Sequence, residues 1–410
     1  MRRSDEPELF TPAPLPTAEL SDAERLACLR LIRSENVGPV TFRELINHFG
    51  GAQKALDALP ELSLRGGSGR PIRLCPKADA EKELMAAARA GSQPLFTIEP
   101  DYPSLLARIE APPPMLYVKG RLELLNRPAI AIVGSRQCSA AGVQLARQFA
   151  HALAEAGFVV VSGLARGIDG AAHEASRARG TVAVVAGGID WTYPPEHADL
   201  QHAIGRDGCL VSERPPGLQP RGKDFPRRNR IIAGLAFGVV IVEAAMRSGT
   251  LVTARYANDL GREVFALPGH PLDPRAAGTN RLLKEGAMLV TEPDEVIEAL
   301  RPMIGIDEPR IGYNAFRATS PADPSDELER PLRQQPEGSG AQRSLPDRRD
   351  SAEAMNAVLA ALGPAPIGID SITRASGLDV QSVQIALLEL DLAGRIERQG
   401  QSLVALKTRL

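Results

Sequence analysis

The clearest indication of the fold is the stretch AIAIVGSRQCSAAGVQLARQFAHALAEAGFVVVSGLARGIDGAAH, residues 129–173. It contains two apolar runs, 129–133 and 158–162, that lack polar alternation, as is typical of parallel strands covered on both faces. Between them, residues 143–157 place apolar side chains at helical spacing and end in a glycine. The stretch therefore predicts a strand, a helix and a second, parallel strand.

The same alternation of strand and helix continues over residues 101–302. Further apolar runs that predict strands lie at 181–186, 209–212, 238–244, 263–267 and 287–291. Repeated strand–helix units predict an α/β fold, namely a doubly wound parallel sheet with helices on both faces.

The flanking sequence predicts four further parts. Residues 1–20 are polar and rich in proline, which favours a disordered tail, and residues 21–100 are expected to form an N-terminal helical domain. Residues 303–350 have the composition of a flexible linker. Residues 351–410 give three helices and then a hairpin, the element order of a winged helix.

The composition excludes several classes of protein. The net charge is −2, so any site for a polyanion must be local. The four cysteines and six histidines lack metal-site spacing, and no metal or cofactor is expected. With no apolar run long enough to span a bilayer and no sign of a signal peptide, a soluble cytoplasmic protein is the expectation.

Glycine and arginine follow the strands of the predicted sheet. In open α/β sheets, ligands bind beyond the carboxyl ends of the strands, and glycine lets a phosphate approach the backbone. The basic residues of these loops are Arg136, Arg166, Arg221, Lys223, Arg227, Arg228 and Arg230. Their convergence on one sheet edge predicts a phosphate-lined cleft.

The loops do not match the common nucleotide motifs. There is no P-loop, and the first loop reads Gly-Ser-Arg at 134–136 rather than G-x-G-x-x-G. Ser162 ends the second strand, where a dinucleotide-binding fold would carry an acid. Ser162, Asp169 and His173 could form a hydrolytic constellation, but an Asp–His pair four residues apart is also a common contact on one helix.

Five motifs of these strands and loops are VGSR, VVSGLARGID, TVAVVAGGID, FPRRNRIIAGLA and VFALPG, and together they resemble the bacterial DNA-processing family DprA, also called Smf. The resemblance implies a Rossmann-like fold, SAM-like N-terminal helices and a homodimer. It also implies a protein without catalytic turnover that binds single-stranded DNA, protects incoming DNA and loads the RecA recombinase during natural transformation.

The resemblance and the loops together give a set of expected site residues. The expected phosphate-binding residues are Gly134, Ser135, Arg136, Ser162, Gly163, Arg166, Asp169, Lys223, Arg227, Arg228, Ser248, Gly249 and Thr250. Phe225 and Tyr193 are candidates for base stacking. Relatives often carry a lysine before the third-strand threonine, whereas Gly180 stands here, preceded by Arg179, so the role of Arg179 stays open.

The stretch DFPRRNRIIAGLA, residues 224–236, places three arginines at a helix N-terminus, where bases are unfavourable. We expect Arg228 to share the buried stripe and bind a DNA phosphate, and Arg230 to face solvent. On this interpretation, Arg228→Ala leaves stability unchanged or raised. The alternative is that Asp224, Glu213 or Glu243 neutralises the arginines, so that the same change is destabilising.

Two other classes of function are weaker alternatives. The fold and the Ser-Gly-Thr at 248–250 also resemble nucleoside-monophosphate phosphoribohydrolases of the lysine-decarboxylase-like group, but Thr253 stands where that motif carries its glutamate. A transcription regulator would read bases with residues 379–392, which contain no arginine or lysine. This composition predicts a winged helix that binds a partner or binds DNA weakly.

Overall fold

The structure is a computed structural model and describes residues 20–67, 70–304, 348–363, 365–399 and 402–407. The chain divides into two compact units, one of Cys75–Ile311 and one that combines Met1–Leu74 with Gly312–Leu410. The expected tail and linker fall almost entirely outside the described residues.

The first unit is built on a nine-stranded sheet in the order β1-β2-β6-β5-β4-β3-β7-β8-β9. The seven predicted strands are confirmed; they are β3 (Ala129–Val133), β4 (Val159–Ser162), β5 (Thr181–Gly188), β6 (Cys209–Arg214), β7 (Gly238–Ile241), β8 (Glu263–Ala266) and β9 (Met288–Leu289). All of these strands pair in parallel. After β3 the chain adds β4, β5 and β6 on one side of β3, and it then adds β7, β8 and β9 on the other side. The switch point of the sheet therefore lies between β3 and β7.

Two strands were not predicted. β1 (Gln93–Phe96) and β2 (Met115–Gly120) extend the sheet beyond β6 with antiparallel pairing. Because β1 belongs to this sheet, the expected boundary of the helical domain at residue 100 is too late, and the sheet unit already begins at Cys75 with α4 (Lys77–Arg89).

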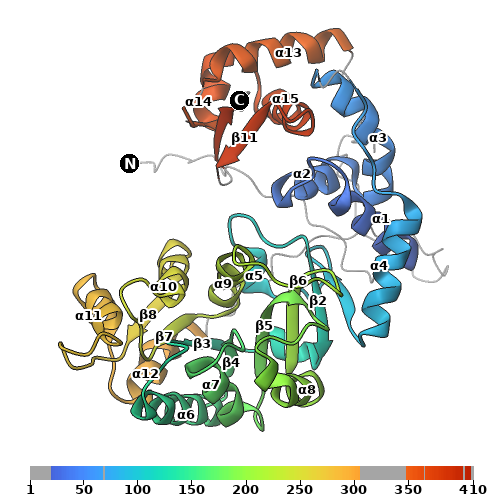
Figure 1. Cartoon of the computed structure of the whole chain (residues 1–410). Helices are drawn as coiled ribbons and strands as arrows, with labels where there is room; N and C mark the ends of the chain where they lie inside the picture. Colours follow the sequence, from blue (N-terminus) through green and yellow to red (C-terminus); the bar gives the residue numbers. More distant parts are fainter. Residues whose placement is uncertain (1–19, 68–69, 305–347, 364, 400–401, 408–410) are drawn as a thin grey trace, which may run out of the picture. The chain divides into compact units, whose positions relative to one another are not determined.

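Helices cover both faces of the sheet, and each face has its own apolar core (Figure 1). One core lies beneath α6 (Ala140–Glu155), α7 (Ile168–Ser176) and α12 (Pro293–Ile304). The other lies beneath α9 (Asp224–Leu235) and α10 (Gly249–Asp259). The remaining helices of the unit are α5 (Ser104–Ala107), η1 (Leu122–Asn126), η2 (Pro195–His197), α8 (Ala198–Asp207) and α11 (Ala277–Lys284).

The second unit joins the two ends of the chain. Its N-terminal part is α1 (Asp22–Arg33), α2 (Pro39–Phe49) and α3 (Ala52–Arg65). Its C-terminal part has the predicted order of helices and hairpin: α13 (Arg348–Ala361), β10 (Ile367–Gly368), α14 (Ile369–Ser376), α15 (Val380–Leu392), β11 (Ile396–Gln399) and β12 (Leu403–Leu406). The guanidinium of Arg398 joins the two parts through Glu44, at 2.8 and 2.9 Å.

No helix among the described residues is both long enough and apolar enough to cross a membrane.

Candidate functional site

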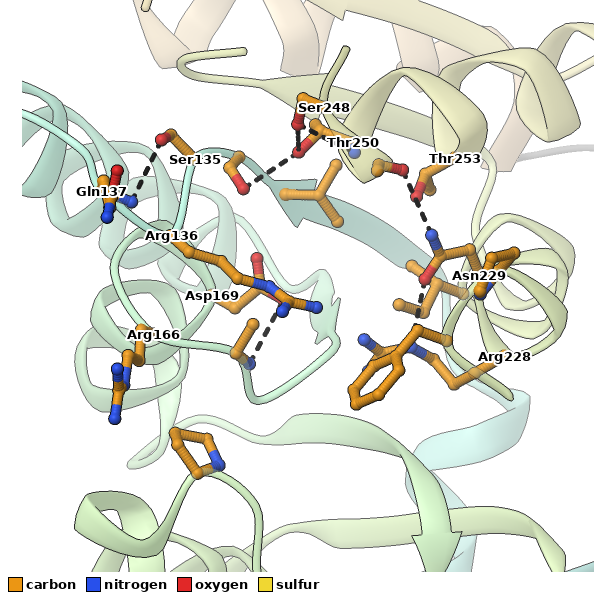
Figure 2. Close-up of a pocket in the computed structure, with 18 of the residues that line it drawn as sticks. Ser135, Arg136, Gln137, Arg166, Asp169, Arg228, Asn229, Ser248, Thr250 and Thr253 are labelled. Carbon is orange, nitrogen blue, oxygen red and sulfur yellow. Dashed lines mark hydrogen bonds between the residues drawn. The ribbon is translucent and has the colours of Figure 1, made fainter. Parts of the chain in front are cut away.

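A cavity of about 730 Å³ opens at the carboxyl ends of β3 and β7, at the switch point of the sheet (Figure 2). Its walls come from the loop after β3, the loop before α7, the segment around Tyr193, and the N-terminal turns of α9 and α10. Its volume is in the range of sites that hold a nucleotide-sized ligand. Five segments far apart in the sequence therefore form one site.

Hydrogen bonds fix the loop after β3 to the start of α10. The hydroxyl of Thr250 donates to the carbonyl of Gly134 at 3.0 Å. Ser248 is the N-cap of α10, and its hydroxyl accepts from the Thr250 backbone N–H at 3.1 Å. Because Ser248, Gly249 and Thr250 all line the cavity, the positive end of α10 faces it, which favours an anion.

Arg228 forms part of the cavity floor and is only 6% exposed. Its Nη1 donates to the carbonyls of Gly163 and Val184, and its Nε donates to the Asn229 side chain at 3.1 Å. Burial lowers the pKa of Arg228 to about 10, so it remains charged at neutral pH. A Cβ at Gly163 would lie 2.3 Å from Nη1, so a larger residue there would displace the Arg228 guanidinium from its present position.

The predicted inward direction of Arg228 is confirmed, but the partners differ from both interpretations of the sequence. None of the three suggested acids bonds to Arg228: Asp224 lies 3.5 Å from Arg214, and Glu243 accepts from Ser139. Glu213 pairs with Arg227 and Arg230, so the alternative holds for these two arginines and not for Arg228. Arg228 is instead held by backbone carbonyls, which lose their partner if the side chain is removed.

The expectation that Arg230 faces solvent is wrong. Its side chain is 16% exposed, and it donates to Glu213 at 2.6 Å and to the carbonyl of Ala111 at 2.9 Å. Arg227 lies one turn earlier on the same face of α9 and is 3.3 Å from the same carboxylate. Glu213 ends β6 beside this face, and this neighbour is not visible in the sequence of α9.

Asp169 anchors the loop between β4 and α7. It is buried, and its carboxylate accepts from the backbone N–H groups of Gly163 at 3.1 Å and Ala165 at 3.4 Å. Burial raises the pKa of Asp169, while the nearby Arg228 opposes this rise. Its oxygens thus fix the loop that carries Arg166.

Ser162 does not reach the cavity. It is fully buried, and its hydroxyl donates to the carbonyl of Ile132 at 2.6 Å, so the expected phosphate contact is wrong for this residue. His173 is also fully buried and lies 2.7 Å from the Thr181 hydroxyl through Nδ1. Because Ser162, Asp169 and His173 each bond to other groups, they do not form the hydrolytic constellation considered above.

Two arginines stand at the mouth of the cavity. The guanidinium of Arg136 lies 5.1 Å from the centre of the Phe225 ring, and the Tyr193 ring packs edge-on against Phe225 at 5.5 Å. Arg166 is exposed and pairs with Glu196. Figure 2 shows Arg136 and Arg228 pointing into the cavity from opposite sides.

Most expected site residues line the cavity, and a few do not. Those that line it are Gly134, Ser135, Arg136, Arg166, Asp169, Tyr193, Phe225, Arg228, Ser248, Gly249 and Thr250. Gly163 lines a small adjoining hollow, whereas Lys223 and Arg227 are exposed outside both. Arg179 precedes β5, at the opposite edge of the sheet, and pairs with Glu155.

Sequence reasoning missed Asn229, Gln137 and Thr253, which also line the cavity. Asn229 accepts from Arg228 and donates to the carbonyl of Gly249 at 3.2 Å, so it ties α9 to α10. The feature of the sequence that could have identified Asn229 is its position next to Arg228 in the arginine-rich first turns of a predicted helix.

The fold and the site together define a Rossmann-like protein with a cavity at its switch point that is lined by arginines and by the N-terminus of a helix. A family model described as DNA recombination-mediator protein A matches residues 93–301. The DprA-like N-terminal HHH domain matches residues 22–86, and the DprA winged helix domain matches residues 342–401.

Similar proteins agree with these matches. Protein Smf of Synechocystis sp. is 31% identical over 403 residues, which cover 93% of this chain and 98% of that protein. DNA processing protein DprA of Streptococcus pneumoniae is 47% identical over 50% of this chain and 73% of that protein. The structural match to the X-ray structure of DprA from Streptococcus pneumoniae covers 63% of this chain and 86% of the solved chain, with 36% sequence identity and a TM-score of 0.52. The chain belongs to the DprA/Smf family of DNA-processing proteins.

Proposed function

We propose that this protein binds single-stranded DNA in the cavity at the switch point, protects incoming DNA and loads the RecA recombinase onto it during natural transformation. The observation that carries the proposal is the combination of arginines, a helix N-terminus and two aromatic rings in one cavity.

Each part of the cavity suits one part of a nucleotide chain. Phosphates are bound by arginine and by helix N-termini, which here are Arg136, Arg166 and the start of α10. Phe225 and Tyr193 offer ring faces and edges for bases. A duplex hides its base faces by stacking, so these rings favour single strands.

We propose a binding role without catalytic turnover. The phosphoribohydrolase alternative is not favoured, because Thr253 lines the cavity at the position where that group carries its glutamate. Asp169 is the carboxylate among the lining residues, and both of its described bonds go to the loop backbone.

The binding part of the proposal is tested by titrating labelled single-stranded and duplex oligonucleotides of equal length across a salt series. We expect preferential binding of the single strand, with affinity falling steeply as salt rises, because phosphate contacts release counterions. Equal affinity for duplex, or turnover of ATP or AMP by the pure protein, contradicts the proposal.

RecA loading needs a separate test. RecA hydrolyses ATP on single strands, and coating the strands with a single-strand-binding protein slows this reaction. We propose that this protein, acting as a cytoplasmic homodimer, shortens the lag before RecA begins to hydrolyse ATP on the coated strands. An unchanged lag at saturating protein would reject RecA loading and leave single-strand binding standing.

A further inference from the structure

Arg166 lines the cavity, and its guanidinium is paired with a carboxylate. Its Nη2 donates to one oxygen of the Glu196 carboxylate at 3.1 Å, and its Nε forms an ion pair with the other oxygen. The two side chains are 62% and 46% exposed, so both can be reached from solvent. Arg166 contributes to the lining, and its charge is already matched.

The short helix η2 presents this carboxylate. Glu196 is its central residue, and the neighbouring His197 lies 3.1 Å through Nδ1 from the carbonyl of Leu164, which belongs to the loop that carries Arg166. The hydrogen bond from Arg166 lowers the pKa of Glu196, which is therefore ionised at neutral pH. The pair is thus held by two segments already fixed to one another.

The geometry of the pair is that of a phosphate contact. Arginine binds a carboxylate and a phosphate through the same two parallel N–H donors. The three arginines of the cavity then differ: Arg228 is buried, Arg136 lies over a ring, and Arg166 is bound by an acid. Of these three arginines, only Arg166 has its phosphate-binding N–H donors occupied by the carboxylate of Glu196.

We propose that Glu196 is an internal competitor for DNA, a residue that occupies Arg166 until a phosphate of the bound strand displaces it. This inference rests on the proposed binding of single-stranded DNA. Glu196 therefore sets the affinity: it weakens the binding of isolated anions and leaves Arg166 to a strand that the other contacts already hold.

The test is Glu196→Gln in the full chain, with single-strand affinity measured by fluorescence anisotropy at low salt. Exposed ion pairs of this kind contribute modestly, so we expect binding to tighten by about twofold to fivefold. In the background of Arg166→Gln the same change should have no effect, because the guanidinium for which Glu196 and the DNA phosphate compete is then absent.

Glu155→Gln is the matched control. It removes the same charge from a bidentate pair with Arg179, at 2.8 and 3.0 Å, whose side chains are 61% and 44% exposed, at the opposite edge of the sheet. We expect it to leave DNA affinity unchanged. Equal tightening by both variants would mean that net charge alone is responsible and would overturn the inference.

Failure of this inference differs from failure of the proposed function. If the wild type binds single strands and Glu196→Gln, folded to the same melting temperature, binds equally well or more weakly, the competitor role is rejected and the binding function stands. If the wild type binds no single-stranded DNA, both are rejected.

Discussion

Arg136 and Arg228 bring the same charge to the same cavity, but their surroundings give them different roles. Arg136 lies over the Phe225 ring, and no carboxylate bonds to it among the residues that the structure describes. Arg228 is buried and bonded to backbone carbonyls on two other segments. One side chain is available to a ligand, and the other holds the cavity together.

Arg136→Ala should therefore weaken DNA binding without weakening the fold. We expect single-strand affinity to fall about tenfold and the slope of log affinity against log salt to shrink by about 0.7, the value of one single-strand phosphate contact. The melting temperature should stay unchanged. Arg179→Ala, at the opposite edge of the sheet, is the control and should leave affinity at the wild-type value.

Arg228→Ala should destabilise the protein, in contrast to the expectation from the sequence. The substitution leaves the carbonyls of Gly163 and Val184 without their donor and removes a buried countercharge of Asp169. We expect the free energy of unfolding, measured in urea, to fall by about 3 kcal/mol. Unchanged stability together with lost DNA affinity would restore the original expectation.

At the scale of elements, α7 packs against β4 and β5 through a buried histidine. His173 lies against Thr181 of β5 through Nδ1, while Thr181 donates to Val160 of β4. Nε2 of His173 is buried without a hydrogen-bond partner among the described residues. Burial lowers the pKa of His173 to about 3, so the imidazole is neutral in the folded protein.

This histidine makes the fold sensitive to acid. Between pH 6.5 and pH 3 the unfolded chain binds a proton at this position and the folded chain does not, so stability falls as the pH falls through that window. The slope from one such group approaches 1.4 kcal/mol per pH unit. We expect His173→Asn, which keeps a donor to Thr181, to show a smaller loss of melting temperature between pH 7.5 and pH 5.

The exposed His151 provides the control for this effect. His151→Asn makes the same substitution on the solvent-facing side of α6. Its melting temperature should follow the wild-type pH profile. If His173→Asn also follows that profile, the acid sensitivity has another source.

At the scale of the whole molecule, every residue that lines the cavity lies between 133 and 253, inside one compact unit. α15, which takes the place of a recognition helix, contains no arginine or lysine. We therefore expect a chain truncated after residue 304 to keep single-strand affinity within about threefold of the wild type. A tenfold loss would show that the C-terminal part takes a direct share in binding.

The two parts of the second unit pack on one another, so this truncation also uncovers part of α3. A second truncation to residues 75–304 removes that unit entirely. If the two truncated chains bind DNA with equal affinity, the uncovered surface of α3 has no effect on binding. Any difference from the wild type then reflects lost DNA contacts. Circular dichroism checks that both chains remain folded.

The seven parallel strands, the helices between them and the order of the winged helix could all be predicted from the amino-acid sequence. These features follow from local apolar periodicity and from glycine, both of which are written within a few consecutive residues. The sequence also brought most of the site together, because the loops after parallel strands must meet at one sheet edge.

The pairing and burial of the charged side chains, in contrast, depend on the three-dimensional arrangement of the elements. Glu213 binds Arg230, Glu196 binds Arg166, and the carbonyls of distant strands hold Arg228. Each of these partners comes from another element, and the antiparallel pairing of β1 with β2 likewise joins segments that no local pattern connects. Periodicity tells which face of an element is apolar, whereas the state of a buried charge depends on what lies across from it.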